Sequence, residues 1–250
     1  MKNSTLWIAL LAFLLTTQTL FAQTLKVPAA SPLQTVKQAF GLGDITVEYY
    51  RPGARDRVVF GDVVPLDKIW RTGANGSTKI TFSDDVIVDG KALKAGTYAL
   101  YSIPGKSTWD ILFYSDLNLG GNVNEYDKSK EVLRLNVKSM TLQDKVETFT
   151  IDFNTISQTS INMDIAWDKT KVRVPIKTEI DSKMMKNIES ALARDTRPYY
   201  QAASYYYDNN KDLTKALEWV SIATDQNPKA IGYGYSKLKF KVKPTTKKVP

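Results

Sequence analysis

The sequence predicts a mainly β protein: an antiparallel β-sandwich of about nine or ten strands, followed by a small α-helical appendage. Between residues 43 and 180, short segments alternate apolar and polar side chains and are joined by turns rich in glycine and proline. No segment in that span has the length and period of a helix, which argues against parallel βαβ units. From residue 181 onward the apolar spacing becomes helical.

The strand candidates follow one another through short connections. The segment DITVEYY, residues 44–50, alternates as a half-buried strand does. Asp89-Gly90 predicts a two-residue hairpin between VIV and KAL, because a type I′ turn needs positive φ at both central positions. Pro104-Gly105 separates GTYALYSI from TWDILFY. The later candidates are EVLRLNV, ETFTIDF, SINMDIAW and KVRVPIKTEI. The predicted sandwich domain spans residues 23–180.

The predicted helical appendage spans residues 181–228. A first helix would begin near a candidate cap, Asp181, and two further helices would meet at Asn209-Asn210. Small and aromatic residues fall where a tetratricopeptide repeat places its packing residues, namely Ala223, Ala216 and Tyr207. We expect these helices either to pack on the sandwich or to dock a protein partner, since one such repeat cannot bury both of its faces.

The two ends of the chain differ in composition from the rest. Residues 1–22 contain Lys2, an apolar stretch and a small residue before Gln23, the order of a secretory signal peptide. The apolar stretch is too short to cross a bilayer, so we expect export without a membrane-spanning segment after cleavage. Residues 229–250 form a basic tail whose glycines and prolines disfavour a helix, and Ser236–Pro250 is predicted to be mobile. A frameshifted terminus is the alternative explanation.

The net charge of +8 arises from the ends of the chain. Seven lysines and no acid lie between Lys229 and Pro250, and the remaining residues after the signal peptide contain 26 basic and 26 acidic side chains. A nucleic-acid-binding domain carries its basic residues on a folded face, so we expect no nucleic-acid partner.

Several chemistries are closed to this chain. It contains no histidine and no cysteine, which excludes a Ser-His-Asp triad, a Cys-His dyad, disulfides and histidine-bearing zinc sites. No cofactor and no metal are expected. The residues Asp116, Asn118, Gly120, Gly121 and Asp127 match a calcium loop in part, although a solvated hairpin loop explains them as well. The acid pairs Asp84-Asp85 and Asp62 with Asp67 leave a carboxylate-based hydrolase or carbohydrate-active enzyme as an alternative function.

An ordered set of motifs resembles a known family. Arg-Pro at residue 51, Phe-Gly at residue 60, WRTGAN from residue 70 and AGTY from residue 95 occur in the order seen in exported proteins of Gram-negative bacteria, catalogued as domain of unknown function 2911 (DUF2911). The resemblance covers about residues 31–178. It implies a β-rich domain in the periplasm or cell envelope, often followed by a helical segment, and implies no established activity. In the loop SDLNLGGNVNEYD we expect this family to show a Trp-Gly pair; Leu119-Gly120-Gly121 stands there instead, which argues against a binding role for this loop.

The strongest candidate binding residues cluster around two predicted turns. They are Arg51, Arg55, Arg57, Trp70, Arg71 and Asn75. Arginine presents a planar fork that matches carboxylate or phosphate, and a tryptophan supplies an apolar wall. The structural alternative places Trp70 in the core and pairs Arg71 with Glu48 or Asp67. We therefore expect a non-enzymatic binding module, with a small anionic or carbohydrate ligand as the candidate partner.

Overall fold

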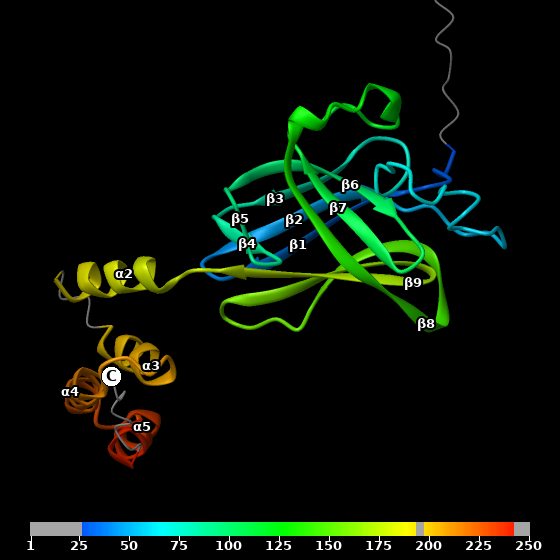
Figure 1. The fold of residues 1–250 in the computed structure, drawn as a ribbon. Coiled ribbons are helices and arrows are strands. Elements are labelled where there is room, and N and C mark those ends of the chain that lie inside the picture. The colour runs from blue at the N-terminus through cyan, green and yellow to red at the C-terminus, as the bar shows by residue number, and fades with distance from the viewer. Residues whose placement is uncertain (1–26, 194–197, 243–250) are drawn as a thin grey trace, which may run out of the picture.

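The computed structural model describes residues 27–193 and 198–242 and confirms a mainly β protein followed by helices (Figure 1). The nine strands are β1 Leu33–Phe40, β2 Gly43–Tyr50, β3 Thr78–Phe82, β4 Val86–Val88, β5 Lys91–Leu93, β6 Gly96–Pro104, β7 Thr108–Tyr114, β8 Glu131–Asn154 and β9 Ser160–Thr178. All neighbouring pairs are antiparallel.

The strands form one sheet in the order β1-β2-β3-β6-β7-β8-β9-β4-β5, and this sheet does not close into a barrel. The first part of β8 pairs with β7, for example Asn136 with Asp110. The second part of β8 pairs with β9, for example Ile151 with Ile165. The long strand β8 therefore passes from one half of the sheet to the other, and the two halves enclose a shared core.

Tyr49 shows how the two halves are joined across the core. Its side chain is fully buried on β2, and its hydroxyl donates to the Ile151 carbonyl at 3.1 Å. The same hydroxyl accepts a hydrogen bond from the Ile151 backbone N–H at 2.9 Å. Burial raises the pKa of Tyr49 above its ordinary value, so this link is insensitive to pH over the physiological range.

The strand pattern differs from the prediction in two ways. β1 is absent from the predicted strands, because it is an edge strand in which only Phe40 is fully buried. The segments EVLRLNV and ETFTIDF are two parts of β8, and SINMDIAW and KVRVPIK are two parts of β9. Register shifts between Thr141 and Thr150 let the hydrogen-bonded ladder continue where the alternation is interrupted. The Asp89-Gly90 hairpin is confirmed, with φ of 46° and 81°.

Four helices follow the sheet: α2 Asp181–Ala193, α3 Tyr199–Asp208, α4 Leu213–Gln226 and α5 Ile231–Val242. The predicted junction at Asn209-Asn210 is confirmed. Asp181 does not cap α2. The Glu179 carboxylate accepts from the Asp181 N–H at 3.0 Å instead, and the Asp181 carboxylate bonds Tyr205 and Lys211. In the described ranges, no helix combines the length and apolarity needed to cross a membrane.

The prediction of a mobile tail from Ser236 is wrong as far as residue 242, because α5 continues to that point. Phe240 is buried and stacks on Tyr207, with ring centroids 4.1 Å apart and planes at 7°. Tertiary packing of this aromatic side chain outweighs the weak helix propensity of the glycine-containing segment. Residues 243–250 and the predicted signal peptide, residues 1–22, lie outside the described residues.

Candidate functional site

A cavity of about 270 Å³ lies beside the segment that connects β2 to β3. We call it the arginine cavity; Arg55, Arg57, Arg71, Trp70 and Trp167 line it together with residues 30–31, 52–53, 63–64 and 73–74. No acidic side chain is among its lining residues. The structure thus brings four of the six predicted binding residues to one place, and whether they bind a ligand stays a prediction.

The connecting segment turns sharply around this cavity. Arg55 and Asp56 both have positive φ, at 51° and 56°, and Asn75 has a φ of 53°. Gly73 has a φ of +155°, and a Cβ at this position would lie 2.9 Å from the Thr78 hydroxyl oxygen. Residue 73 therefore has to be glycine, since it combines a left-handed conformation with close contact to its neighbour.

Trp70 is both a core residue and a wall of the cavity. Its backbone N–H and carbonyl pair with those of Ser102, both at 2.8 Å, and its indole N–H donates to the Gly73 carbonyl at 3.0 Å. The ring stacks on Trp167 with centroids 6.0 Å apart. Only 9% of Trp70 is exposed. Trp70 therefore lies in the core, as the structural alternative expects, and also lines the cavity, while its contact with a ligand stays a prediction.

Arg55 and Arg57 are positioned by neutral groups. The Arg55 guanidinium donates to the Ala30 carbonyl at 2.8 Å. Arg57 donates to the carbonyls of Ala54 and Gly53 at 3.0 and 2.9 Å. Such bonds fix the direction of each guanidinium group and leave its charge uncompensated.

The carboxylates of Asp56 and Glu147 form ion pairs with Lys145 rather than with the arginines. Glu147 accepts from the Arg55 backbone N–H at 2.7 Å and pairs with Lys145 at 3.3 Å. That backbone N–H is the first cause of the lowered pKa of Glu147. Among the residues that the structure describes, no ion pair is formed by the guanidinium groups of Arg55, Arg57 or Arg71.

Arg71 has the least satisfied side chain of the three arginines. Its Nε atom is buried and has no hydrogen-bond partner. Its Nη1 atom lies close to Gly121, where an added Cβ would come within 3.0 Å. The predicted structural pairing of Arg71 with Glu48 or Asp67 is not formed. A buried N–H without a partner costs free energy.

Arg51 and Asn75, the other two predicted residues, do not line the arginine cavity. Arg51 donates to the Phe149 carbonyl at 3.0 Å and to the Thr150 hydroxyl at 2.8 Å, so it links the end of β2 to β8. Asn75 donates to the Ser31 carbonyl at 3.5 Å. Trp167 was missed by the sequence analysis, because an aromatic residue in an alternating strand looks like ordinary core.

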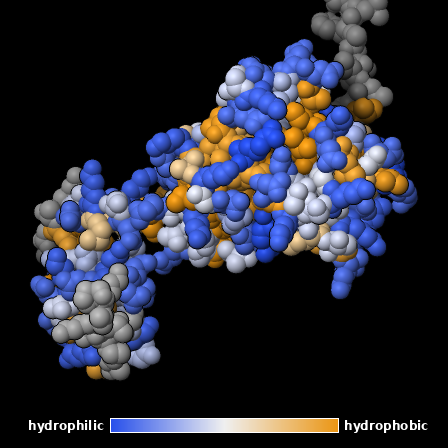
Figure 2. Space-filling view, in the orientation of Figure 1, coloured by the Kyte–Doolittle hydropathy of each residue, from blue (hydrophilic) through white to orange (hydrophobic). Residues whose placement is uncertain are grey.

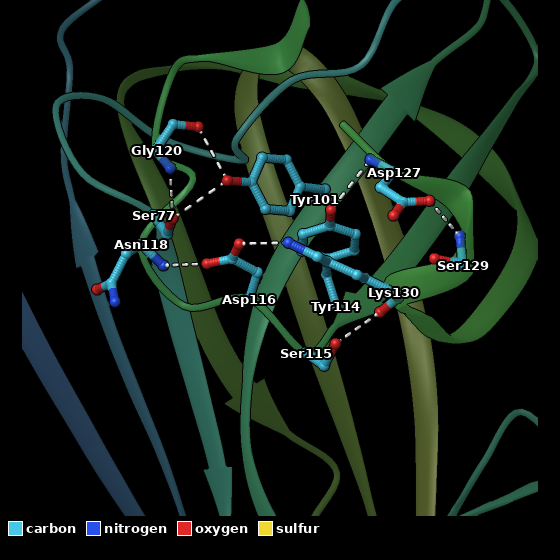
Figure 3. Close-up of polar contacts among 10 residues, drawn as sticks. All are labelled: Ser77, Tyr101, Tyr114, Ser115, Asp116, Asn118, Gly120, Asp127, Ser129 and Lys130. Carbon is cyan, nitrogen blue, oxygen red and sulfur yellow. Dashed lines mark hydrogen bonds and ion pairs between the residues drawn. The ribbon is translucent and has the colours of Figure 1, made fainter. Parts of the chain in front are cut away.

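Residues 115–130, which we call the cover loop, fold over the outer face of β6 and β7 (Figure 3). The Tyr101 hydroxyl donates to the Gly120 carbonyl at 2.9 Å, and the Gly120 N–H donates to the Ser77 hydroxyl at 2.9 Å. Asp116 pairs with Lys130 at 2.9 Å, and this contact lowers the pKa of Asp116.

The partial calcium motif is thus used within the cover loop. Asp127 accepts from the Ser129 N–H at 2.9 Å, whereas Asp116 faces the Lys130 ammonium (Figure 3). The described part of the chain contains no group of three acidic side chains placed to hold a metal ion. The Lys130 ammonium group beside Asp116 also repels an approaching cation.

A second cavity, of about 540 Å³, adjoins the arginine cavity at Val63, Trp70 and Arg71. We call it the loop cavity, because the cover loop supplies part of its wall. Its further lining residues are Pro65, Asp67, Lys68, Ile69, Gly121, Val123 and Asn124.

A third cavity, of about 350 Å³, contains the predicted acid pair Asp84-Asp85 together with Glu179. We call it the acidic cavity. Asp84 forms an ion pair with Lys183, and Asp85 pairs with Lys94 at 2.8 Å. The hydrogen bond from Lys94 lowers the pKa of Asp85, whereas a general acid needs a raised pKa. The pair Asp62 and Asp67 is not brought to one cavity, since only Asp67 lines the loop cavity.

Comparison with known proteins places the β domain in a family. The model of a family described as a protein of unknown function, DUF2911, matches residues 31–176, which is more than half of the chain. This range includes all residues that line the arginine cavity except Ala30. Comparisons with curated proteins and with solved structures give no match. The chain therefore belongs to the DUF2911 family of proteins of unknown function.

Proposed function

We propose that this protein is an exported, non-enzymatic binding module whose arginine cavity holds a small anionic ligand. One observation carries the proposal: Arg55, Arg57 and Arg71 line the same cavity, and their guanidinium groups form no ion pair among the described residues. A guanidinium fork matches the geometry of a carboxylate or a phosphate, and a partly enclosed site strengthens the attraction relative to water.

The size and walls of the cavity favour an anion over a neutral sugar. Its volume of about 270 Å³ suits an anionic group of a few atoms, below the range of about 300–1,000 Å³ typical of drug-sized ligands. Sugars stack on open aromatic faces, but Trp70 and Trp167 are only 9% and 1% exposed. The tryptophans therefore act as a rigid wall behind the arginines rather than as a stacking platform.

The proposal of export rests on the sequence of residues 1–22 and on the resemblance to envelope proteins of Gram-negative bacteria. A binding role agrees with a fold that carries its cavity on the loops of a rigid sandwich. The ion pairs of Asp84 with Lys183 and of Asp85 with Lys94 favour binding over hydrolysis, because they occupy both carboxylates.

Calorimetric titration with inorganic phosphate and with acetate tests the proposal. We expect both anions to bind at low ionic strength and more weakly as salt is added. Arg71→Ala should weaken binding by about 10-fold or more, because it removes hydrogen bonds between two charged groups. Arg71→Lys keeps the charge without the fork and should lie between the wild type and Arg71→Ala.

The matched control is Lys177→Ala, which removes one positive charge from an exposed position on β9 outside the three cavities. It should leave the affinity unchanged. Thermal unfolding of every variant shows whether the fold is retained. Absence of binding for both anions at millimolar concentration, or equal affinity in folded Arg71→Ala, would overturn the proposed function.

A further inference from the structure

The arginine cavity and the loop cavity meet at a common edge formed by Val63, Trp70 and Arg71. A ligand with its anionic group among the three arginines has the loop cavity directly beside it. We infer that the ligand is amphipathic: a monocarboxylate whose carboxylate lies in the arginine cavity and whose short hydrocarbon chain lies in the loop cavity. This inference rests on the proposed function and names its ligand class.

The difference in charge between the two cavities sets the direction of such a ligand. The arginine cavity has three cationic side chains and no acid. The loop cavity has Asp67 and Lys68, whose charges balance, in addition to the shared Arg71. The anionic group is therefore drawn to the arginines, and the other end of the ligand meets a wall with little net charge.

The lining of the loop cavity suits a hydrocarbon chain. Pro65, Ile69 and Val123 supply apolar surface, and Trp70 and Val63 extend it to the arginine cavity. Ile69, Val63 and Val123 are half-buried, so each still presents surface to the cavity. Covering this surface with a hydrocarbon chain removes apolar area from water on both partners, which is favourable in proportion to that area.

Arg71 lies at the boundary between the two cavities. Its Nε atom is buried without a hydrogen-bond partner, and Arg55 and Arg57 already donate to backbone carbonyls. Because the Arg71 side chain lines both cavities, a carboxylate bound at its guanidinium group would place the chain of the ligand at the mouth of the loop cavity. Simple phosphate could bind at the same guanidinium group but would leave the loop cavity to water.

The wall formed by the cover loop is held in place without a ligand. Gly120 is bonded to both Tyr101 and Ser77, and the Asp127 N–H donates to the Tyr114 hydroxyl at 3.1 Å (Figure 3). Val123 begins a short 3₁₀ helix, Val123–Glu125, between these two attachments. Because the wall is already ordered, binding of a chain costs little additional conformational entropy.

The test is the dependence of affinity on chain length, measured by calorimetry with acetate, butanoate, hexanoate and octanoate below their micelle concentrations. Each methylene that becomes buried should tighten binding by up to about fourfold. The dissociation constant should therefore fall along the series until the loop cavity is filled. Hexanol, which has the chain without the carboxylate, should bind far more weakly than hexanoate.

Two variants locate the hydrocarbon chain. Val123→Ser should reduce the gain in affinity from acetate to hexanoate by about threefold or more, and it should leave the affinity for acetate unchanged. Asn124→Leu adds apolar lining to the same wall and should increase that gain. The matched control is Val132→Ser, because Val132 is 48% exposed on β8 and lines none of the three cavities.

The outcomes separate this inference from the proposed function. Binding of acetate and phosphate with no gain along the chain series would overturn the amphipathic ligand and leave the anion site intact. A gain that is identical in Val123→Ser and Asn124→Leu would place the chain elsewhere and also overturn the inference. Failure of every anion to bind would overturn both.

Discussion

The arginine cavity and the acidic cavity lie at the two ends of the same strand, β2. The charged side chains that line the first are all cationic, whereas three acids and Lys183 line the second. Near the start of β2, the Asp44 N–H donates to the Ser83 hydroxyl, beside Asp84 and Asp85. At its end, Tyr50 leads into the arginine segment. In the acidic cavity, Asp84 and Asp85 form ion pairs with Lys183 and Lys94, whereas the guanidinium groups of the arginine cavity form no ion pair within the described residues.

The physical difference lies in the groups that satisfy the charged side chains. Lysine carries its charge on a long flexible stem and reaches nearby carboxylates on the surface. The guanidinium groups of Arg55 and Arg57 are instead held by backbone carbonyls, which orient a cation without cancelling its charge. A cluster of like charges therefore indicates a binding site only when the groups that bond those side chains do not cancel their charge.

The two cavities also differ in how they relate to the core. Figure 2 shows hydrophobic residues gathered on the β domain, while the helices are mostly hydrophilic on the face in view. The arginine cavity rests on the buried aromatic cluster through Trp70 and Trp167. The acidic cavity lies where the sheet meets α2, with Glu179 and Lys183 among its lining residues. We expect substitutions at the first cavity to affect folding more strongly.

The largest expected effect is that of Trp70→Ala. Trp70 contacts Phe149 with ring centroids 5.2 Å apart and stacks on Trp167, so its removal leaves a cavity in the core. The free energy of unfolding should fall by about 3–5 kcal/mol, measured by urea denaturation. Tyr235→Ala is the control, because Tyr235 is 70% exposed on α5. A loss below about 1 kcal/mol for Trp70→Ala would contradict the link between cavity and core.

A smaller effect is expected for Arg51→Ala, which sharpens the contrast among the arginines. Arg51 bonds Phe149 and Thr150 and lies outside the arginine cavity. The free energy of unfolding should fall by about 1–3 kcal/mol, because hydrogen bonds from a charged group are lost. Phosphate affinity should stay within about twofold of the wild type. An affinity loss as large as that of Arg71→Ala would place Arg51 in the binding site after all.

The smallest effect concerns the acidic cavity and its dependence on pH. The hydrogen bond from Lys94, followed by that from the Ala95 N–H, holds the pKa of Asp85 below its ordinary value. A lowered folded-state pKa means that the stabilisation is present above about pH 4 and is lost as the pH falls through the folded pKa.

Urea midpoints of the wild type and Asp85→Asn at about pH 6 and about pH 2.5 measure this contribution. Asp85→Asn should lower the midpoint slightly at the higher pH, and the two proteins should converge at the lower pH. A difference that persists unchanged in acid would show that the carboxylate charge of Asp85 is not what stabilises this end of the sheet.

Much of the β domain was predictable because its signals are local. The alternation of DITVEYY and the Asp89-Gly90 turn depend on neighbouring residues only, and both appear as expected. β1 was missed because an edge strand buries too little of its side chains to show a clear alternation. The tail prediction failed at α5 because the contact between Phe240 and Tyr207 joins residues far apart in the sequence.

The candidate site shows the same division between local sequence signals and contacts among distant residues. Arg55, Arg57, Trp70 and Arg71 were selected from one stretch of sequence, and they line one cavity. Arg51 belongs to the same stretch but points to β8, a strand about 100 residues later. Trp167 completes the wall of the cavity from β9 and had no local signal.

The amino-acid sequence by itself determined the fold class, the absence of histidine and cysteine chemistry, and the family to which the β domain belongs. Tertiary structure decided which charges are compensated, which arginines share a cavity, and that β8 joins both halves of the sheet. The physical reason is the distance along the chain over which each interaction acts. Backbone propensity and alternation act between neighbouring residues, whereas the partners of a charged side chain depend on strands that meet only after the chain has folded.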